Sequence, residues 1–228
     1  MSRFEIKKDP TKVFILGTGG GCEYAPKESE RLYYCLNDYI KVEKYGIKPD
    51  VLFIMDTLDE KPQIVSGSDN LGDIVARINS LRVPFIAPYK YEEIPLSQAF
   101  PLNECARQFG APYFKNTIGY MIAYALLQKV KEMDIYGVNQ ASSGEYYYEK
   151  GSVEYWLGIA IGRGVKIKIW GENSELLTDK RRFGGNILYG YNMTYEELKA
   201  STEKYGEGVI KKLSVKIPNT NRIVRSIN

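Results

Sequence analysis

The side chains best suited to chemistry lie together in one short segment of this chain. Residues 139–149 carry several amide, phenol and carboxylate side chains, among them Asn139, Glu145, Tyr146, Tyr147, Tyr148 and Glu149. The segment follows an apolar run over 133–138 that predicts a buried strand. Ligands of open α/β sheets bind outside the carboxyl ends of the strands. We therefore expect 139–149 to be a loop that carries the site, with one or two of its tyrosines facing the ligand.

A glycine-rich turn is the second candidate. The predicted strand 12–16 leads into Gly17, Thr18, Gly19, Gly20 and Gly21. Glycines let the backbone turn sharply and bring bare N–H groups close to a phosphate. The turn is not a complete dinucleotide fingerprint, since Cys22 stands where the last glycine would be, and it lacks the lysine and serine of a P-loop. The pattern predicts a cradle for the phosphate of a nucleotide or nucleotide-sugar, and the alternative is a turn that binds nothing.

Asn37 and Asp56 follow two other apolar segments, 32–36 and 51–55. Both residues are therefore expected at the edge of the sheet where ligands bind. Asp56 is able to bind ribose hydroxyls or a metal ion, or to act as a base. The alternative is a turn or a helix cap, to which aspartate is equally suited.

The start of a predicted helix over 116–131 is a candidate for anion binding. Lys115, Asn116 and Thr117 stand at this point, where free N–H groups and the helix dipole attract negative charge. Plain capping of the helix by Asn116 or Thr117 is the alternative.

Strand and helix patterns alternate along the chain. Strands are expected over 12–16, 51–55, 83–87, 133–138 and 165–170, and helices over 27–34, 69–81, 102–109, 116–131 and 152–161. The run 32–36 either continues the first of these helices or forms a further strand. This alternation predicts an α/β fold of modified Rossmann-like type, a mostly parallel sheet with helices on both faces.

Two regions are expected along the chain. Residues 1–178 are interpreted as a Rossmann-like nucleotide-binding domain. After residue 177 the chain turns polar and basic, and a helix is expected over 194–205. We interpret 179–228 as a basic C-terminal appendage that serves as a lid or as the contact of a homo-oligomer.

Composition excludes several classes of function. The chain has 228 residues and a net charge of +3, which permits a phosphorylated ligand or nucleic acid without arguing for either. No apolar run approaches the length of a membrane span, and three scattered cysteines suit the reducing cytoplasm. The chain contains no histidine, which excludes Ser–His and Cys–His nucleophile pairs and a histidine general base.

The order of these motifs resembles one superfamily. The motifs are the glycine turn, Asn37, a strand between Pro49-Asp50 and Asp56, the helix start Asn116-Thr117-Ile118-Gly119, the segment Ile135-Tyr136-Gly137-Val138-Asn139, and Asn173-Ser174. They are similar to those of the superfamily that contains the bacterial CMP-sialic-acid-dependent sialyltransferases, the motility-accessory-factor glycosyltransferases and the MptE-like pterin pyrophosphokinases. Small phage-encoded relatives also belong to it. The resemblance covers roughly residues 12–177.

The resemblance implies a site for a nucleotide-activated donor. The residues it assigns to donor binding are Gly17, Thr18, Gly19, Gly20, Gly21, Asn37, Lys115, Asn116, Thr117, Gly119, Asn139, Tyr146 and Tyr147. In the sialyltransferases a histidine beyond the tyrosine-bearing loop is the base, an arginine precedes the helix motif, and an aspartate stands in the place of Asn139. Here there is no histidine, and Lys115 stands near the place of the arginine. The catalytic candidates are three carboxylates, Glu149, Glu145 and Asp56, because burial raises the pKa of a carboxyl group towards the range of a general base.

These expectations converge on a nucleotide-sugar-dependent transferase, a glycosyltransferase with an unknown acceptor. A phage origin would make DNA a candidate acceptor. The nucleotide-activated donor is a co-substrate, no residue is assigned to a metal, and Mg²⁺ is not indicated. One alternative is an MptE-like pyrophosphokinase, which would need Mg²⁺ and further acidic ligands near Asp56. The other is a non-catalytic protein that binds or sequesters a nucleotide, which the missing histidine favours.

Overall fold

The computed structural model describes most of the first three quarters of the chain. The described residues are 8–36, 43–58, 70–110, 113–140, 145–171 and 174–177, with short pieces at 187–188, 193–194, 197, 200 and 224–227. The chain divides into one compact unit, Met1–Leu176 with Ile223–Asn228, and a second, Leu177–Arg222. In the second unit β8 (Ile187–Leu188) pairs antiparallel with β9 (Met193–Thr194). Most of the expected helix over 194–205, and the candidate Asn37, lie outside the described residues.

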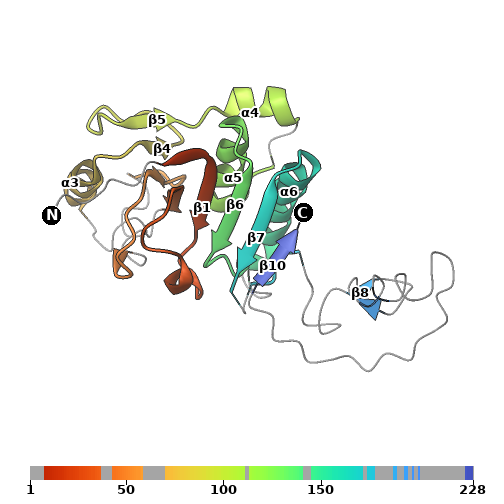
Figure 1. Ribbon diagram of the computed structural model, residues 1–228. Helices are drawn as coiled ribbons and strands as arrows, with labels where there is room; N and C mark the ends of the chain where they lie inside the picture. The colour runs from red at the N-terminus through yellow and green to blue at the C-terminus, as the bar shows by residue number, and fades with distance from the viewer. Residues whose placement is uncertain are drawn as a thin grey trace. The chain divides into compact units, whose positions relative to one another are not determined.

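The first unit is built on one sheet, shown in Figure 1. In the described part of the chain its strands are β1 (Asp9–Leu16), β2 (Arg31–Leu36), β3 (Val51–Phe53), β4 (Phe85–Ala87), β5 (Ser97–Ala99), β6 (Glu132–Tyr136), β7 (Lys166–Trp170) and β10 (Val224–Ile227). Their order is β10-β7-β6-β1-β2-β3-β4-β5. Strands β1 to β7 are parallel, and β10 pairs antiparallel with β7. The predicted α/β, Rossmann-like arrangement is confirmed.

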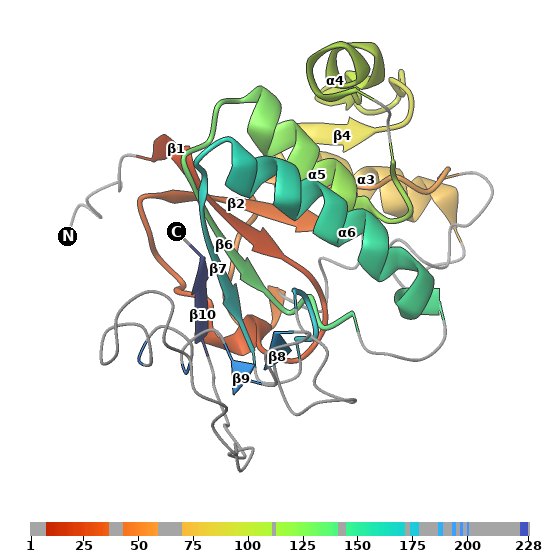
Figure 2. The same ribbon diagram turned by 90° about the vertical axis from the view of Figure 1, so that its right-hand side faces the viewer.

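Helices cover both faces of this sheet. The described helices are α3 (Leu71–Leu81), α4 (Leu102–Phe109), α5 (Thr117–Leu127) and α6 (Glu145–Gly162), with a 3-10 helix, η1 (Cys22–Tyr24). Ile74 of α3 packs in one buried cluster with Leu52 of β3, whereas Tyr124 of α5 contacts Phe53, the next residue of β3, with ring centroids 5.4 Å apart. Because neighbours in a strand point to opposite faces, α3 and α5 lie on opposite faces of the sheet. Figure 2 shows α6 running beside α5.

The expected helix over 27–34 is wrong. Residues Arg31–Leu36 form β2, which pairs with β1 on one side and β3 on the other, so the alternative of a strand over 32–36 is right. Tyr33 and Tyr34 are both buried and point to opposite faces. A strand enclosed on both faces loses the apolar–polar alternation that would distinguish it from a helix, and its aromatic residues suit a sheet. Among the described residues the β1–β2 connection contains η1 and no α-helix.

The segment 145–149 is helical, which corrects the expectation of a loop. Helix α6 begins at Glu145 rather than near Ser152. The expected boundary followed Gly151, a residue that usually weakens a helix. In the structure Gly151 lies inside α6, where an added Cβ would meet the Tyr113 hydroxyl at 3.2 Å. Gly151 therefore allows Tyr113 to approach the helix and does not end it.

The path of the chain through the sheet creates a switch point. From β1 the chain proceeds outward through β2, β3, β4 and β5, and then returns through α5 to β6 on the other side of β1. The carboxyl ends of β1 and β6 therefore lie side by side while their connections diverge. In open α/β sheets this is where ligands bind.

A polar cluster is built into the sheet on the side of α3. Arg31 of β2 forms ion pairs with Glu132 and Asp134 of β6 at 2.8 and 3.5 Å. The indole N–H of Trp170 donates to Asp134 at 3.0 Å. Asp134 is buried, so these partners compensate its loss of water. The cluster accounts for an acidic residue inside an otherwise apolar strand.

The three cysteines should be chemically inert in the native protein. Cys22, Cys35 and Cys105 are all buried and unpaired with one another. Burial raises the pKa of the Cys22 thiol to about 12 and that of Cys105 to about 11, and it raises that of Cys35 well above its usual value. At pH 8 the reactive thiolate is therefore scarce. We expect negligible reaction with Ellman's reagent in buffer and reaction of all three thiols in guanidinium chloride. Rapid release of one equivalent from native protein would contradict this assignment.

Candidate functional site

The turns after β1 and β6 are hydrogen-bonded to each other. The N–H of Gly17 donates to the carbonyl of Tyr136 at 2.8 Å, and the N–H of Gly19 donates to the carbonyl of Gly137 at 2.9 Å. The pairing of the two strands thus continues past their ends, and it holds the two turns together at the switch point.

Asn139 completes this junction with its side chain. In the amide orientation that satisfies both of its groups, Nδ2 donates to the carbonyl of Gly20 at 3.1 Å and Oδ1 accepts from the N–H of Gly20 at 3.3 Å. The N–H of Gly21 donates to the Glu23 carboxylate at 2.9 Å. The sequence-predicted Asn139 and glycine turn are therefore brought together.

These contacts bear on the expected phosphate cradle. The N–H groups of Gly17, Gly19, Gly20 and Gly21 all have acceptors within the protein. A phosphate at this turn would have to replace some of those acceptors. The carboxylate of Glu23 already accepts from one of these N–H groups, that of Gly21, in the way that a phosphate oxygen would. Phosphate binding by the turn stays a prediction.

The glycines are explained by close approach of the backbone. A Cβ on Gly17 would clash with the Gly137 carbonyl, and a Cβ on Gly19 would lie 2.8 Å from the same oxygen. Gly21 has a φ of 104°, and Gly137 has a φ of 65°. Both values lie in the left-handed region that favours glycine. Cys22 closes the turn, because its thiol donates to the Gly17 carbonyl at 2.8 Å.

The start of α5 and the first turns of α6 form a second cluster of candidate residues. The side chain of Asn116 caps α5, with Oδ1 accepting from the N–H of Gly119 at 3.0 Å. Its Nδ2 donates to the Glu149 carboxylate of α6 at 3.1 Å. The predicted cap is confirmed, and one side chain joins it to the predicted catalytic Glu149.

Neighbouring contacts fix the two helices to each other. The N–H of Lys115 donates to the Ser152 hydroxyl at 3.1 Å, and that hydroxyl donates to the Tyr113 carbonyl at 3.0 Å. An added Cβ on Gly119 would lie 3.2 Å from the same hydroxyl. Ser152, buried between the helices, was missed by sequence reasoning because a serine in a helix gives no local signal of its partners.

The remaining predicted residues occupy different places. Thr117 is the first residue of α5, and the side chain of Lys115 is exposed. Glu145, Tyr146 and Tyr147 form the first turn of α6, and their side chains lie outside the described part of the structure. Asp56 lies in the turn after β3, about 10 Å along the sheet from β1 at the usual strand spacing.

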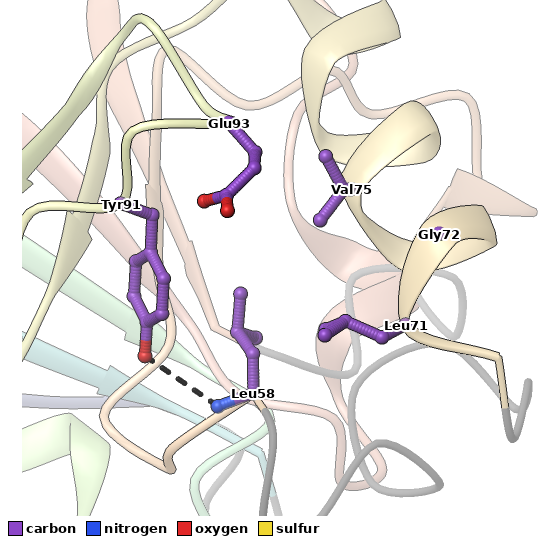
Figure 3. Close-up of a pocket in the computed structure, with 6 residues that line it drawn as sticks. All are labelled: Leu58, Leu71, Gly72, Val75, Tyr91 and Glu93. Carbon is purple, nitrogen blue, oxygen red and sulfur yellow. Dashed lines mark hydrogen bonds between the residues drawn. The ribbon is translucent and has the colours of Figure 1, made fainter.

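A pocket of about 440 Å³ lies on the β3 side of the unit, lined by Leu58, Leu71, Gly72, Val75, Tyr91 and Glu93. Figure 3 shows apolar side chains from the start of α3 facing Tyr91 and Glu93 across it. The Tyr91 hydroxyl accepts from the N–H of Leu58 at 3.5 Å. Asp56 precedes Leu58 by two residues. The lining of this pocket is mostly apolar, and no sequence motif indicated it.

Two searches of the described residues bear on the broad class. They contain no group of three or more cysteine, aspartate or glutamate side chains placed to hold a metal ion. None of the helices they form has the length and apolar character needed to cross a membrane.

Comparison with known proteins adds no relative. No family model matches the chain, and no curated protein or solved structure is significantly similar to it. The resemblance to the sialyltransferase superfamily therefore stays a prediction, and the site is argued from its own geometry.

Replacing Gly17 by alanine should strongly destabilise the protein. The new methyl group would meet backbone atoms of Gly137 and the Val138 side chain, and backbone cannot move aside cheaply. We expect a loss of about 3 kcal/mol in the free energy of unfolding, measured by urea denaturation. Gly158→Ala is the matched control, since no neighbour lies within 4 Å of its added Cβ in α6, and it should gain about 0.5–1 kcal/mol. Equal effects of the two substitutions would contradict the junction described above.

The two roles of Asn116 can be separated by substitution. Asn116→Ala removes the cap and should lower the free energy of unfolding by about 1 kcal/mol. Asn116→Ser keeps a capping oxygen but loses the N–H that reaches Glu149. It should lower the free energy of unfolding by only about 0.3 kcal/mol. Urea denaturation at pH 7 measures both. If the serine variant loses as much as the alanine variant, the contact with Glu149 and not the cap carries the energy.

Proposed function

We propose that this protein is a nucleotide-sugar-dependent transferase, a glycosyltransferase whose donor binds at the β1–β6 switch point. The observation that carries the proposal is the hydrogen bond between Asn116 and Glu149, which orients a carboxylate at the starts of two helices. Both helices begin at the carboxyl edge of the parallel sheet, because each precedes a strand and runs back to its amino end. The candidate base thus belongs to a helix that begins at the edge where ligands of such sheets bind.

The proposed reaction is a direct displacement at the anomeric carbon of the donor. An acceptor hydroxyl attacks that carbon and gives its proton to Glu149, while the bond from the carbon to the phosphate oxygen breaks. The electron pair of that bond leaves with the nucleotide. The positive ends of the α5 and α6 dipoles face the same edge and would stabilise the negative charge that develops on the leaving phosphate. The exposed side chain of Lys115, just before α5, adds a positive charge there.

A second function deserves the same test. The N–H groups of the glycine turn already have protein acceptors, and the chain has no histidine. The missing histidine favours a protein that binds a nucleotide without turning it over, and the occupied N–H groups mean that the phosphate of any such nucleotide would displace protein acceptors or lie away from the turn. The cytoplasmic location, the phage origin, the DNA acceptor and the homo-oligomer remain predictions that accompany the transferase proposal.

A binding screen followed by a turnover assay tests the proposal. Thermal shifts are measured with CMP-, UDP- and GDP-sugars, ATP and free nucleotides, each with and without Mg²⁺. The ligand that stabilises the protein is then incubated with it, and release of free nucleotide is followed. We expect Glu149→Gln to retain binding and to lower kcat by about a hundredfold or more, as for loss of a general base.

Glu154→Gln is the matched control for this experiment. Glu154 lies in the same helix and pairs with Lys150 at 3.7 Å, a partly exposed ion pair of small energetic weight. Its variant should bind and turn over like the wild type. Stabilisation without turnover would favour the sequestering protein, and Mg²⁺-dependent release of AMP from ATP would favour a pyrophosphokinase. If no nucleotide stabilises the wild type, the proposal fails.

A further inference from the structure

The residue that follows Asn139 stands out from its surroundings. Gln140 is 6% exposed, yet its carbonyl oxygen Oε1 has no hydrogen-bond partner within the described structure. Most buried polar atoms of native proteins have partners, and an exception calls for an explanation. Gln140 lies inside the segment 139–149 that the sequence singled out, although it was not among the candidate residues named there.

The backbone carbonyls that precede Gln140 in this turn are engaged in hydrogen bonds. The carbonyls of the three preceding residues each accept a hydrogen bond from a different segment. Gly137 accepts from the N–H of Gly19 at 2.9 Å, and Val138 accepts from the Ser174 hydroxyl at 2.9 Å. Asn139 accepts from the N–H of Glu175 at 2.8 Å. The turn is thus held from both sides, and its position does not depend on Gln140.

Gln140 is also held in an unfavourable backbone conformation. Its φ is 45°, in the left-handed region that non-glycine residues rarely adopt. Asparagine or glycine would fit this conformation more easily. Strain of this kind gathers at ligand sites, where the surrounding contacts enforce it. Two independent costs, a buried acceptor and a strained backbone, therefore fall on one residue at the switch point.

We propose that Gln140 is a specificity residue of the ligand site, and that its Oε1 accepts a hydrogen bond from the uncharged part of the ligand. This inference rests on the proposed nucleotide site. A carbonyl oxygen repels phosphate oxygens, so its partner is an N–H or O–H group. A nucleoside or sugar offers such groups as the amino or imino groups of the base and the hydroxyls of the sugar. Binding then supplies the missing partner and favours ligands that carry it in place.

The proposal assigns the two ends of a nucleotide ligand to different places. The neutral end lies against Gln140, beside the glycine turn whose N–H groups already have acceptors. The phosphate end is then directed away from that turn. This arrangement explains why a glycine-rich turn is compatible with a nucleotide site even though its amides face protein.

Gln140→Leu tests the inference with opposite signs for stability and affinity. Leucine has a similar size and removes the buried acceptor, so the free variant should melt at the wild-type temperature or above it. Its affinity for CMP, UMP, GMP or AMP, measured by calorimetry for whichever binds the wild type, should fall about ten- to a hundredfold. Gln128→Leu is the matched control, because Gln128 is exposed at the end of α5 away from the site. It should change neither quantity.

Modified nucleotides identify the partner group. If a sugar hydroxyl binds Gln140, the 2′-deoxy form of the ligand should bind the wild type and Gln140→Leu equally well. If the exocyclic amino group of guanine binds Gln140, then IMP, which lacks that group, should bind the wild type and Gln140→Leu equally well, whereas GMP should not. Gln140→Asn, which keeps the amide but withdraws it by one methylene, should also lose affinity and serves if the leucine variant fails to fold.

The outcomes separate this inference from the proposed function. Wild-type affinity in both Gln140→Leu and Gln140→Asn, with any nucleotide that binds the wild type, overturns the inference and leaves the nucleotide site intact. A fall in melting temperature of the free leucine variant without loss of affinity identifies a structural role and overturns it as well. Absence of nucleotide binding by the wild type overturns the proposed function together with the inference.

Discussion

The close approach of two turns, after β1 and after β6, is the constraint on which the ligand-binding edge depends. Gly17 can lie against the Gly137 carbonyl only because it has no side chain. That contact lets the Asn139 amide reach both backbone groups of Gly20. Gln140, the next residue after Asn139, is buried. The glycine turn looks like a phosphate loop. In this fold its first role is to let the ends of β1 and β6 approach each other, although the chain leaves these two strands in opposite directions.

Local patterns were sufficient for the framework of the fold. The cap at Asn116 and the helix Leu102–Phe109 follow from side chains adjacent in sequence, so they were predictable. The strand at Arg31–Leu36 was ambiguous because its burial on both faces is decided by α3 and α5, far away in the chain. The link from Asn116 to Glu149 joins the cap of one helix to a side chain of another, and Gln140 has a buried Oε1 without a partner in the part of the chain that the structure describes. No spacing along one segment contains that information.

The candidate site contains polar side chains that are fully hydrogen-bonded and others that are not. Around Asn116 and Asn139 each amide is used twice, as donor and as acceptor. Such paired use holds side chains in one orientation without leaving a buried group unsatisfied. Gln140 differs, because its buried Oε1 has no partner among the described residues. Glu149 is held in place by Asn116 but remains half-exposed. Rigid, mutually supported surroundings are what a preorganised binding site requires.

The last strand, β10, shows that the C-terminal region is connected to the sheet at both of its ends. Because Val224 pairs with Trp170, the chain returns to the sheet beside the strand from which it departed. Residues 177–222 are therefore an insertion between two neighbouring strands, tethered at both ends, and not a tail. The final strand also covers the edge of β7, whose open backbone groups would otherwise invite pairing with other chains. A chain cut after residue 178 would lose a sheet edge as well as the insertion, so poor behaviour of such a fragment would say little about what the insertion does.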